Sequence, residues 1–205
     1  YKRIGEGDTG LNTGGMGAIS PVPFLTEDFR EKIETQIVKP TIEGLKKDNL
    51  PYKGFVFIGL IKVGNEPKVI EYNVRMGDPE TEVVIPRIKN DFLAILQAVD
   101  EGKLNEIDLE IDPSVAATVV TVSGGYPEAY KKGKRITGLA EQEDKMIFHA
   151  GTKQEGDDII TAGGRVLAVT SFGKDHQEAV EASYKIISKI DFEGINYRKD
   201  IGFDL

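Results

Sequence analysis

Residues 68–82 read K-V-I-E-Y-N-V-R-M-G-D-P-E-T-E, and this stretch combines a strand pattern with a dense group of polar side chains. Apolar and polar residues alternate along residues 69–75, which is the period of a β-strand. Such a strand would place Glu71, Asn73 and Arg75 on one face, opposite an apolar face. The stretch therefore predicts a strand that presents a carboxylate, an amide and a guanidinium to the same surface.

Charge density is the second feature of this stretch. Four carboxylates fall within residues 71–82 around one arginine, and charges this crowded repel one another unless cations share the site. A half-solvated sheet face is the alternative for any strand with one polar side. A hard divalent ion fits the crowding better, because Mg2+ prefers oxygen ligands and completes its shell with water and phosphate oxygens. We therefore predict Glu71 and Asn73 as metal ligands, and Arg75 as a contact for phosphate or a substrate carboxylate.

Glycine is concentrated near the start of the chain, with six glycines in residues 5–17. Residues 5–10 satisfy the pattern G-x-G-x-x-G, but a dinucleotide site needs a strand before that pattern and a helix that opens inside it. Turn residues follow here instead, up to Ser20-Pro21. We therefore expect a mobile loop whose backbone amides approach an anionic ligand, with a merely flexible connection as the alternative.

The rest of the first half predicts a scaffold for the polar strand. Thr26 is placed to cap a helix. Pro40 should kink or end this helix, and a second helical piece should follow. An apolar run over residues 54–63 predicts the first strand of a hairpin, buried on both faces, that leads into the polar strand. Asp91 should cap a further helix that Gly102 ends.

The second half has a different pattern, and we place a domain boundary between residues 111 and 112. Beyond it, short apolar segments between glycine-rich turns predict strands. They cover residues 117–123, 145–150, 158–161 and 165–170. Asp175 with Glu178 predicts the capping box of a packing helix. The sequence thus indicates an α+β fold that ends in a small β-rich domain.

Composition excludes several classes of function. The chain has 205 residues and 40% hydrophobic content, which allows one large domain or two small ones with their own cores. Its formal net charge of -8 disfavours nucleic-acid binding, and no apolar run is long enough to cross a membrane. Without cysteine there is no disulfide, thiolate metal site or thiol nucleophile, which is compatible with the cytosol.

Four segments of the sequence carry a resemblance to a known family. They are G-E-G-D-T-G-L-N-T-G-G-M-G-A-I-S-P at 5–21, R-M-G-D-P-E at 75–80, F-H-A-G-T-K at 148–153 and R-K-D-I-G at 198–202. In this order they resemble segments of the glycinamide ribonucleotide synthetases, also called phosphoribosylamine-glycine ligases, which are ATP-grasp enzymes of purine synthesis. The resemblance covers nearly the whole chain. Because the family proteins are much longer, it implies that an N-terminal half precedes Tyr1.

The resemblance implies a fold and an activity. Residues 1–111 would form the C-terminal portion of an ATP-grasp catalytic domain, mainly an antiparallel sheet with helices, and residues 112–205 a small β-rich domain with a packing helix. The implied reaction is ATP-dependent ligation of glycine to 5-phosphoribosylamine through a glycyl phosphate, giving glycinamide ribonucleotide, ADP and phosphate. Mg2+ or Mn2+ would serve as the metal. A cytoplasmic location, and the N-terminal half of the same enzyme as a partner, are also implied.

The resemblance further implies roles for individual residues. Arg75 and Asp78 are the expected catalytic residues, and Glu71 and Asn73 are the expected metal ligands. The expected substrate and phosphate contacts are Asp8, Asn12, Gly14, Gly15, Met16, Glu80 and Thr81. By resemblance alone, Arg198 and Lys199 would face a ligand.

Other charged residues are expected to be structural. His149 lies on a predicted strand and should be hydrogen-bonded, and His176 should be solvated in the first turn of a helix. The basic residues within 131–135 are typical of an exposed turn.

Two other functions remain open from the sequence. The first is another ATP-grasp ligase that joins a different carboxylate and amine. The second is a folded fragment without activity of its own that acts only as a binding module, because lysines over the phosphates would lie before Tyr1.

Overall fold

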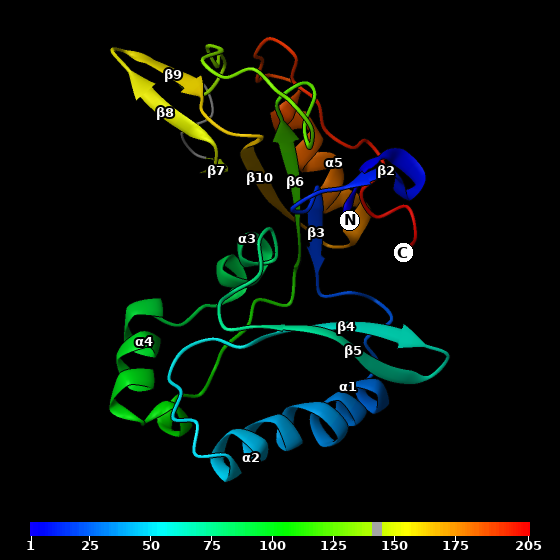
Figure 1. The fold of residues 1–205 in the computed structure, drawn as a ribbon, viewed down its shortest axis with the longest axis vertical. Coiled ribbons are helices and arrows are strands. Elements are labelled where there is room, and N and C mark those ends of the chain that lie inside the picture. The colour runs from blue at the N-terminus through cyan, green and yellow to red at the C-terminus, as the bar shows by residue number, and fades with distance from the viewer. Residues whose placement is uncertain (141–144) are drawn as a thin grey trace. The chain divides into compact units, whose positions relative to one another are not determined.

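The chain forms two compact units in the computed structural model, which describes residues 1–140 and 145–205 (Figure 1). The sheet unit contains Tyr1–Pro21, Asp78–Arg87 and Ile111–Leu205, and the hairpin unit contains Val22–Gly77 and Ile88–Glu110. The sequence predicts one boundary, between residues 111 and 112, and so divides the chain into two consecutive ranges. The contacts instead join the N-terminal segment and the turn at Asp78 to the C-terminal part. Antiparallel sheets with a few helices confirm the α+β class.

The sheet unit is built around a four-stranded antiparallel sheet with the strand order β3-β6-β10-β7. β6 (Val115–Val122) and β10 (Arg165–Gly173) pair along their length and are almost entirely buried. Their near-continuous runs of Val, Ala and Thr suit strands that are covered on both faces. β3 (Gly17–Ser20) and β7 (Met146–His149) lie at the two edges.

Helices pack on both faces of this sheet. α5 (His176–Ile187) contacts β6 and β10 and buries its apolar stripe in the main core. Asp175 caps this helix as predicted, since its Oδ1 accepts a hydrogen bond from the Glu178 amide at 2.9 Å. On the other face, α3 (Thr81–Val84) packs Val83 against β3 and β6. The segment that follows Asp78 is thereby anchored to the sheet.

Two small hairpins complete the sheet unit. β1 (Arg3–Gly5) and β2 (Thr9–Asn12) are joined by the 3-10 turn Glu6–Asp8, so the glycine-rich segment begins as a hairpin and not as one loop. Only this three-residue 3-10 turn, and no α-helix, lies inside the G-x-G-x-x-G pattern, which removes the dinucleotide interpretation. β8 (Thr152–Glu155) and β9 (Asp158–Thr161) form the second hairpin. The strands predicted beyond residue 112 are confirmed, but β8 reads T-K-Q-E, and its polar sequence does not predict a strand.

One helical segment in three parts supports the hairpin unit. The parts are α1 (Glu27–Ile33), a π-helical turn (Glu34–Val38) and α2 (Lys39–Lys47). Thr26 caps α1 as predicted, because its Oγ1 accepts a hydrogen bond from the Phe29 amide at 3.3 Å. The interruption expected at Pro40 is the wider π-helical turn directly before α2. Pro40 itself occupies the first turn of α2, where the donor that proline lacks is not needed.

The hairpin of this unit pairs β4 (Phe57–Val63) with β5 (Glu66–Asn73). The expectation that its first strand is buried on both faces is wrong, since Ile61 and Val63 are 50% and 55% exposed. The physical reason is that the sheet has only two strands, and α1 and α2 lie along one side of it (Figure 1). The strands are therefore held mainly by each other and by one layer of helix.

A further helix of the hairpin unit, α4 (Phe92–Glu101), follows its sequence signals closely. Asp91 Oδ1 accepts a hydrogen bond from the Leu93 amide at 2.9 Å. Gly102 ends the helix with a φ of 72°, a left-handed conformation that glycine adopts without steric cost. Both predicted ends of this helix are confirmed, and the 3-10 turn Leu104–Glu106 follows.

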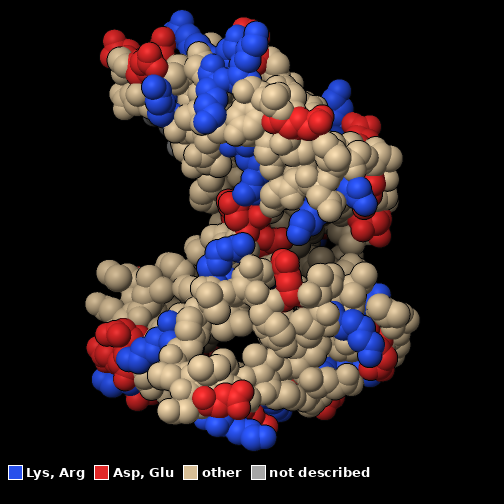
Figure 2. Space-filling model, viewed as in Figure 1, with Lys and Arg blue, Asp and Glu red and all other residues tan. Residues whose placement is uncertain are grey.

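The surface carries charges of both signs. Figure 2 shows Lys and Arg side chains interspersed with Asp and Glu on the visible face of each unit. Within the part of the chain that the structure describes, no helix is long and apolar enough to span a membrane.

Candidate functional site

The residues singled out in the sequence fall into two groups, one in each compact unit. Glu71, Asn73 and Arg75 belong to the hairpin unit, on β5 and just after it. The sheet unit contains the others, namely Asp8, Asn12, Gly14, Gly15, Met16, Asp78, Glu80 and Thr81. The geometry of each group follows from the fold of its own unit.

Glu71 and Asn73 share one face of β5, as the alternation predicts. The Asn73 side-chain amide donates a hydrogen bond to Glu71 Oε1 at 3.2 Å. Gly59 lies opposite Glu71 in the strand register, and a β-carbon at residue 59 would lie 3.0 Å from Glu71 Cγ. The glycine therefore leaves room beside the carboxylate. The sequence pattern alone gave no signal for this role of Gly59.

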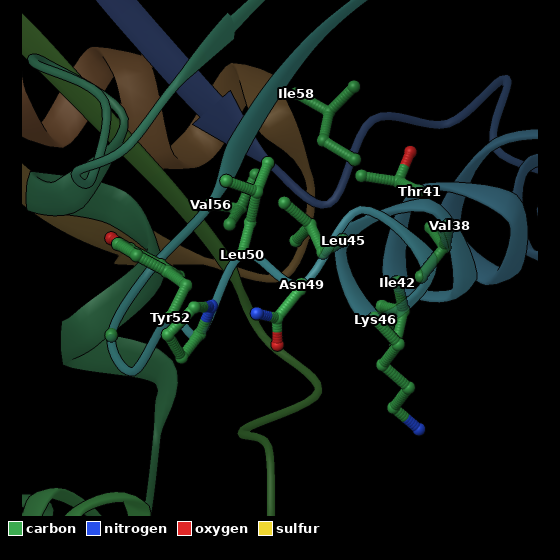
Figure 3. Close-up of a pocket in the computed structure, with 12 residues that line it drawn as sticks. Val38, Thr41, Ile42, Leu45, Lys46, Asn49, Leu50, Tyr52, Val56 and Ile58 are labelled. Atoms are coloured by element: carbon green, nitrogen blue, oxygen red, sulfur yellow. The ribbon is translucent and has the colours of Figure 1, made fainter.

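Tyr72, between these two residues, belongs to the opposite face of β5. Its hydroxyl lies 3.1 Å from Thr41 Oγ1 on α2, and its ring lines a cavity of about 590 Å3. An overlapping cavity of about 720 Å3 lies between α2 and the start of β4 (Figure 3). Figure 3 shows Leu45 and Val56 at this cavity and the Lys46 amine pointing away from it. No carboxylate is among the residues that line this cavity.

Arg75 lies in a bend and not on the strand, because β5 ends at Asn73. Directly after the strand, the Tyr52 hydroxyl lies 3.0 Å from the Val74 carbonyl oxygen and 2.8 Å from the Phe55 carbonyl oxygen. Arg75 Nη1 donates to the Met76 carbonyl at 2.9 Å, and the side chain is exposed. The guanidinium is thus accessible to a phosphate or carboxylate from solvent.

The oxygens of Glu71 and Asn73 fit a hard cation that brings other ligands with it. They supply one carboxylate and one amide, whereas Mg2+ takes about six oxygen ligands. Within residues 1–140 and 145–205, no group of three His, Cys, Asp or Glu side chains could hold a metal ion. Water and substrate phosphates would have to complete the shell, as is usual for Mg2+. The donor set therefore suits a metal that is bound together with a nucleotide.

Arg165, at the start of β10, binds the turn that carries Asp78. Its Nη2 donates to Asp78 Oδ2 at 2.8 Å, and its Nη1 donates to the Asp78 and Gly14 carbonyls at 3.2 and 3.1 Å. The Asp78 side chain is still 55% exposed. Sequence reasoning missed Arg165, because an arginine after two glycines at the start of a strand is not a specific signal.

The backbone amides of the N-terminal loop have acceptors inside the protein. Gly14 N–H donates to Tyr126 OH, and Gly15 N–H donates to Thr13 Oγ1, each at 2.9 Å. Met16 is fully buried in an apolar cluster of the sheet unit. In this structure these hydrogen bonds and the burial of Met16 shape the loop, and contact of Gly14, Gly15 and Met16 with a substrate or phosphate stays a prediction.

Asp8 has a structural partner in Arg198. Arg198 Nη1 lies 2.5 Å from Asp8 Oδ1, and its Nε lies 2.8 Å from Asp200 Oδ1. Burial alone lowers the pKa of Arg198, but the hydrogen bonds to Asp200 and Asp8 outweigh burial and raise it. The expectation that Arg198 faces a ligand is wrong, because its side chain is 0% exposed and its donors bind the protein. Lys199, beside it, is exposed.

The other predicted residues lie at the ends of elements or on the surface. Asn12 is exposed at the end of β2, and Glu80 is half-buried directly before Thr81, the first residue of α3. His149 Nδ1 lies 2.9 Å from Thr152 Oγ1, which confirms a hydrogen-bonded histidine on a strand. The basic cluster within 131–135 is a mostly exposed segment with ion pairs, as expected.

Glu82, on α3, is an incompletely satisfied carboxylate. Its Oε2 is buried and has no hydrogen-bond partner among the described residues. Burial raises the pKa of Glu82, and the charges of Asp78 and Glu80 raise it further, whereas Arg165 acts in the opposite direction. The pKa in the folded state thus lies above that of the unfolded chain. The contribution of Glu82 to the stability of the fold is therefore complete at pH values below its pKa in the unfolded chain. It is lost as the pH rises through its pKa in the folded protein.

Glu82→Gln should therefore raise the midpoint of thermal unfolding by about 2 °C near neutral pH, because it removes the charge and keeps the shape. The gain should vanish below the ordinary carboxyl pKa of 4.5. Calorimetry on both proteins across this pH range measures the effect, with the exposed Glu128→Gln as the matched control. An equal gain at both ends of the range would show that the charge of Glu82 is not the cause.

Known proteins match both halves of the chain. Residues 1–81 match the ATP-grasp (A) domain of phosphoribosylglycinamide synthetase, and residues 116–204 match its C domain. The phosphoribosylamine-glycine ligases of Chlorobaculum tepidum and Caldanaerobacter subterraneus are 45% and 46% identical to this chain, over 98% of its length and 48% of theirs. The crystal structure of phosphoribosylamine-glycine ligase from Thermotoga maritima has a TM-score of 0.88 and 38% identity, and covers 98% of this chain and 49% of that one.

The sheets, their helices and the match of residues 1–81 define the chain as part of an ATP-grasp protein. The polar strand is compatible with this class, because Glu71 and Asn73 carry oxygens of the kind that a hard divalent metal prefers. More specifically, the chain belongs to the phosphoribosylglycinamide synthetase family. It spans about half the length of the relatives it matches.

Proposed function

We propose that the natural full-length protein containing these residues is an ATP-dependent ligase that joins glycine to 5-phosphoribosylamine. The products would be glycinamide ribonucleotide, ADP and phosphate. The proposal is carried by the match of one chain to both the A and the C domains of a single enzyme family. Relatives at 45% and 46% identity bear the name phosphoribosylamine-glycine ligase. A cytoplasmic location belongs to the same proposal and rests on the family assignment.

The proposed reaction needs no side-chain nucleophile. The glycine carboxylate attacks the γ-phosphate of ATP, and ADP leaves. The amine of phosphoribosylamine then attacks the acyl carbon of glycyl phosphate, phosphate leaves, and the amine nitrogen releases one proton as the amide forms. Such a reaction depends on holding the reactants in line and on stabilising the negative charge that develops on phosphate oxygens. Metal ligands and exposed guanidinium groups meet those requirements.

The residues of the hairpin unit would act on the phosphates. Glu71 and Asn73, two residues apart on β5, would hold Mg2+ or Mn2+ through a carboxylate oxygen and the amide oxygen. The metal, when bound, neutralises and orients the phosphate oxygens. Arg75 is exposed directly after β5 and would bind phosphate or the glycine carboxylate with its planar set of donors.

The residues of the sheet unit would act on the substrate that supplies the amine. Asp78 is held through one carboxylate oxygen and is half exposed, so it can accept a hydrogen bond from an amine. Glu80 and Thr81 follow it on the turn into α3 and would shape the pocket, together with the loop at Asn12. This assignment extends the sequence expectations and rests on the position of the turn.

ADP formation by the full-length protein tests the proposed function. Glycine and phosphoribosylamine together should give ADP and the mass of glycinamide ribonucleotide, at a rate at least about tenfold above that with other amino acids or amines. Each substrate omitted in turn is the control. Equal turnover of an unrelated carboxylate and amine would favour a different ATP-grasp ligase, and no ADP from any pair would contradict ligase activity.

A further inference from the structure

Arg165 joins two segments that are distant in the sequence. Its donors bind Gly14, which is 151 residues away, and Asp78, which is 87 residues away. The guanidinium contacts a carboxylate oxygen and two backbone carbonyls, at 2.8 to 3.2 Å. The planar guanidinium makes these contacts from two separate nitrogens, whereas a lysine ammonium would have to make them from one. One side chain thus fixes the loop and the turn against each other.

Tyr126 holds the same loop residue from the other side. Its hydroxyl accepts the Gly14 N–H at 2.9 Å, while Arg165 donates to the Gly14 carbonyl. Both polar groups of the Gly14 backbone are therefore bound by residues from the range that matches the C domain. Gly164 makes this possible, because a β-carbon there would lie 2.2 Å from the Tyr126 ring.

The loop and the turn pack too closely for side chains on the loop. A β-carbon at Gly14 would lie 2.9 Å from Arg165 Cζ, and one at Gly15 would lie 2.4 Å from Pro79 Cδ. Gly15 also has a φ of 123°, which other residues rarely adopt. The two glycines of the N-T-G-G segment are thus explained by contact with the Asp78 turn and with Arg165.

Arg165 also offsets the negative charge of this turn. Its side chain is only 20% exposed, whereas the Asp78 side chain is 55% exposed, so the guanidinium is largely covered by the protein and water reaches the pair from the carboxylate side. Glu80 and Glu82 follow Asp78, and the three carboxylates repel one another. Without Arg165, the Asp78 carboxylate would lose its one charged partner among the described residues and would be pushed away from its neighbours.

We propose that Arg165 is a positioning residue for the ligation reaction, and that Tyr126 assists it. It fixes the Gly14 and Gly15 segment against the turn and holds one oxygen of Asp78, so that the other oxygen is set for the incoming amine. The C-domain range thereby contributes directly to the geometry of the substrate site. This inference rests on the proposed function, because it assigns the orientation of Asp78 to that reaction.

Arg165→Ala in the full-length protein tests the inference. We expect kcat to fall about 10- to 100-fold, because a small misplacement of a reacting group has effects of that size, while KM for ATP changes little. Millimolar guanidinium chloride should restore part of kcat, and the same concentration of sodium chloride should not. Arg135→Ala is the matched control, since Arg135 also pairs with an aspartate, Asp158, at 2.8 Å on an exposed segment.

Hydrogen exchange at the Gly14 and Gly15 amides gives a readout that does not depend on activity. Both amides should exchange faster in Arg165→Ala and in Tyr126→Phe than in the wild type or in Arg135→Ala. Wild-type kcat in Arg165→Ala, or a loss of kcat that guanidinium does not restore, would overturn the positioning role. If the wild type makes no glycinamide ribonucleotide but the exchange still rises, the proposed function fails and the structural link remains.

Discussion

Glu71→Gln in the full-length protein is expected to lower kcat/KM about 100-fold or more at limiting Mg2+. The substitution keeps the size of the side chain and removes the negative charge that a hard cation requires. Glu71 is exposed and makes no ion pair among the described residues, so little stability should be lost. The same reasoning applies to Asn73→Leu, which removes the amide oxygen. Asn73→Asp retains an oxygen there and should keep more activity.

The dependence of the rate on Mg2+ distinguishes a metal ligand from a structural residue. For Glu71→Gln, the Mg2+ concentration that gives half-maximal rate should rise, and high Mg2+ should restore part of the activity. Glu66→Gln is the matched control, because Glu66 is a glutamate of the same strand that pairs with Lys32 at 2.6 Å. Wild-type rates for Glu71→Gln at limiting Mg2+ would remove Glu71 from the metal site.

Arg198→Met is expected to destabilise the fold by about 3 to 5 kcal/mol at neutral pH. Arg198 is fully buried, and it binds Asp8 and Asp200 while its guanidinium lies over the Tyr1 ring at 5.3 Å. Methionine fills part of the space but leaves the two aspartates without their cation. Asp8 is 51% exposed, but Asp200 is only 18% exposed, so the largely buried Asp200 carboxylate left without its cation is the main source of the effect. The midpoint of urea unfolding measures it.

Two controls isolate the buried charge as the cause. Arg30→Met removes an arginine that also pairs with two carboxylates, Glu27 and Glu34, but on an exposed helix surface. Its effect should stay below about 1 kcal/mol, because exposed pairs contribute little. Adding Asp200→Asn to Arg198→Met should recover part of the loss, since it removes the unpaired carboxylate. A loss as large for Arg30→Met, or no recovery in the double variant, would contradict this account.

The effect of Arg198→Met should also depend on pH in a defined direction. The hydrogen bond from Arg198 lowers the pKa of Asp200 below its ordinary value of 3.8. The stability that this ion pair contributes is therefore present at pH values above the pKa of Asp200 in the unfolded chain. It is lost as the pH falls through the pKa of Asp200 in the folded protein. The difference between Arg198→Met and the wild type should be constant near neutral pH and should shrink below about pH 4. A difference that grows in acid would contradict the assignment.

The sequence by itself determined the local structure wherever one short signal was enough. Thr26, Asp91 and Asp175 begin their helices through hydrogen bonds to amides two or three residues ahead, and Gly102 ends one by its backbone conformation. The shared face of Glu71 and Asn73 follows from strand alternation alone. The resemblance to one family was likewise recognised from the residues of four segments and their order along the chain. The matches to the A and C domains of that family confirm it.

Only the tertiary structure decided which long-range partners these residues have. Arg198 carries no local signal that separates a ligand contact from a buried ion pair, and burial settled the question. Arg165 and Tyr126 meet Gly14 across more than a hundred residues, a distance over which sequence periodicity carries no information. The physical reason is that caps and alternation depend on neighbours along the chain, whereas burial and charge pairing depend on which distant segments the fold brings into contact.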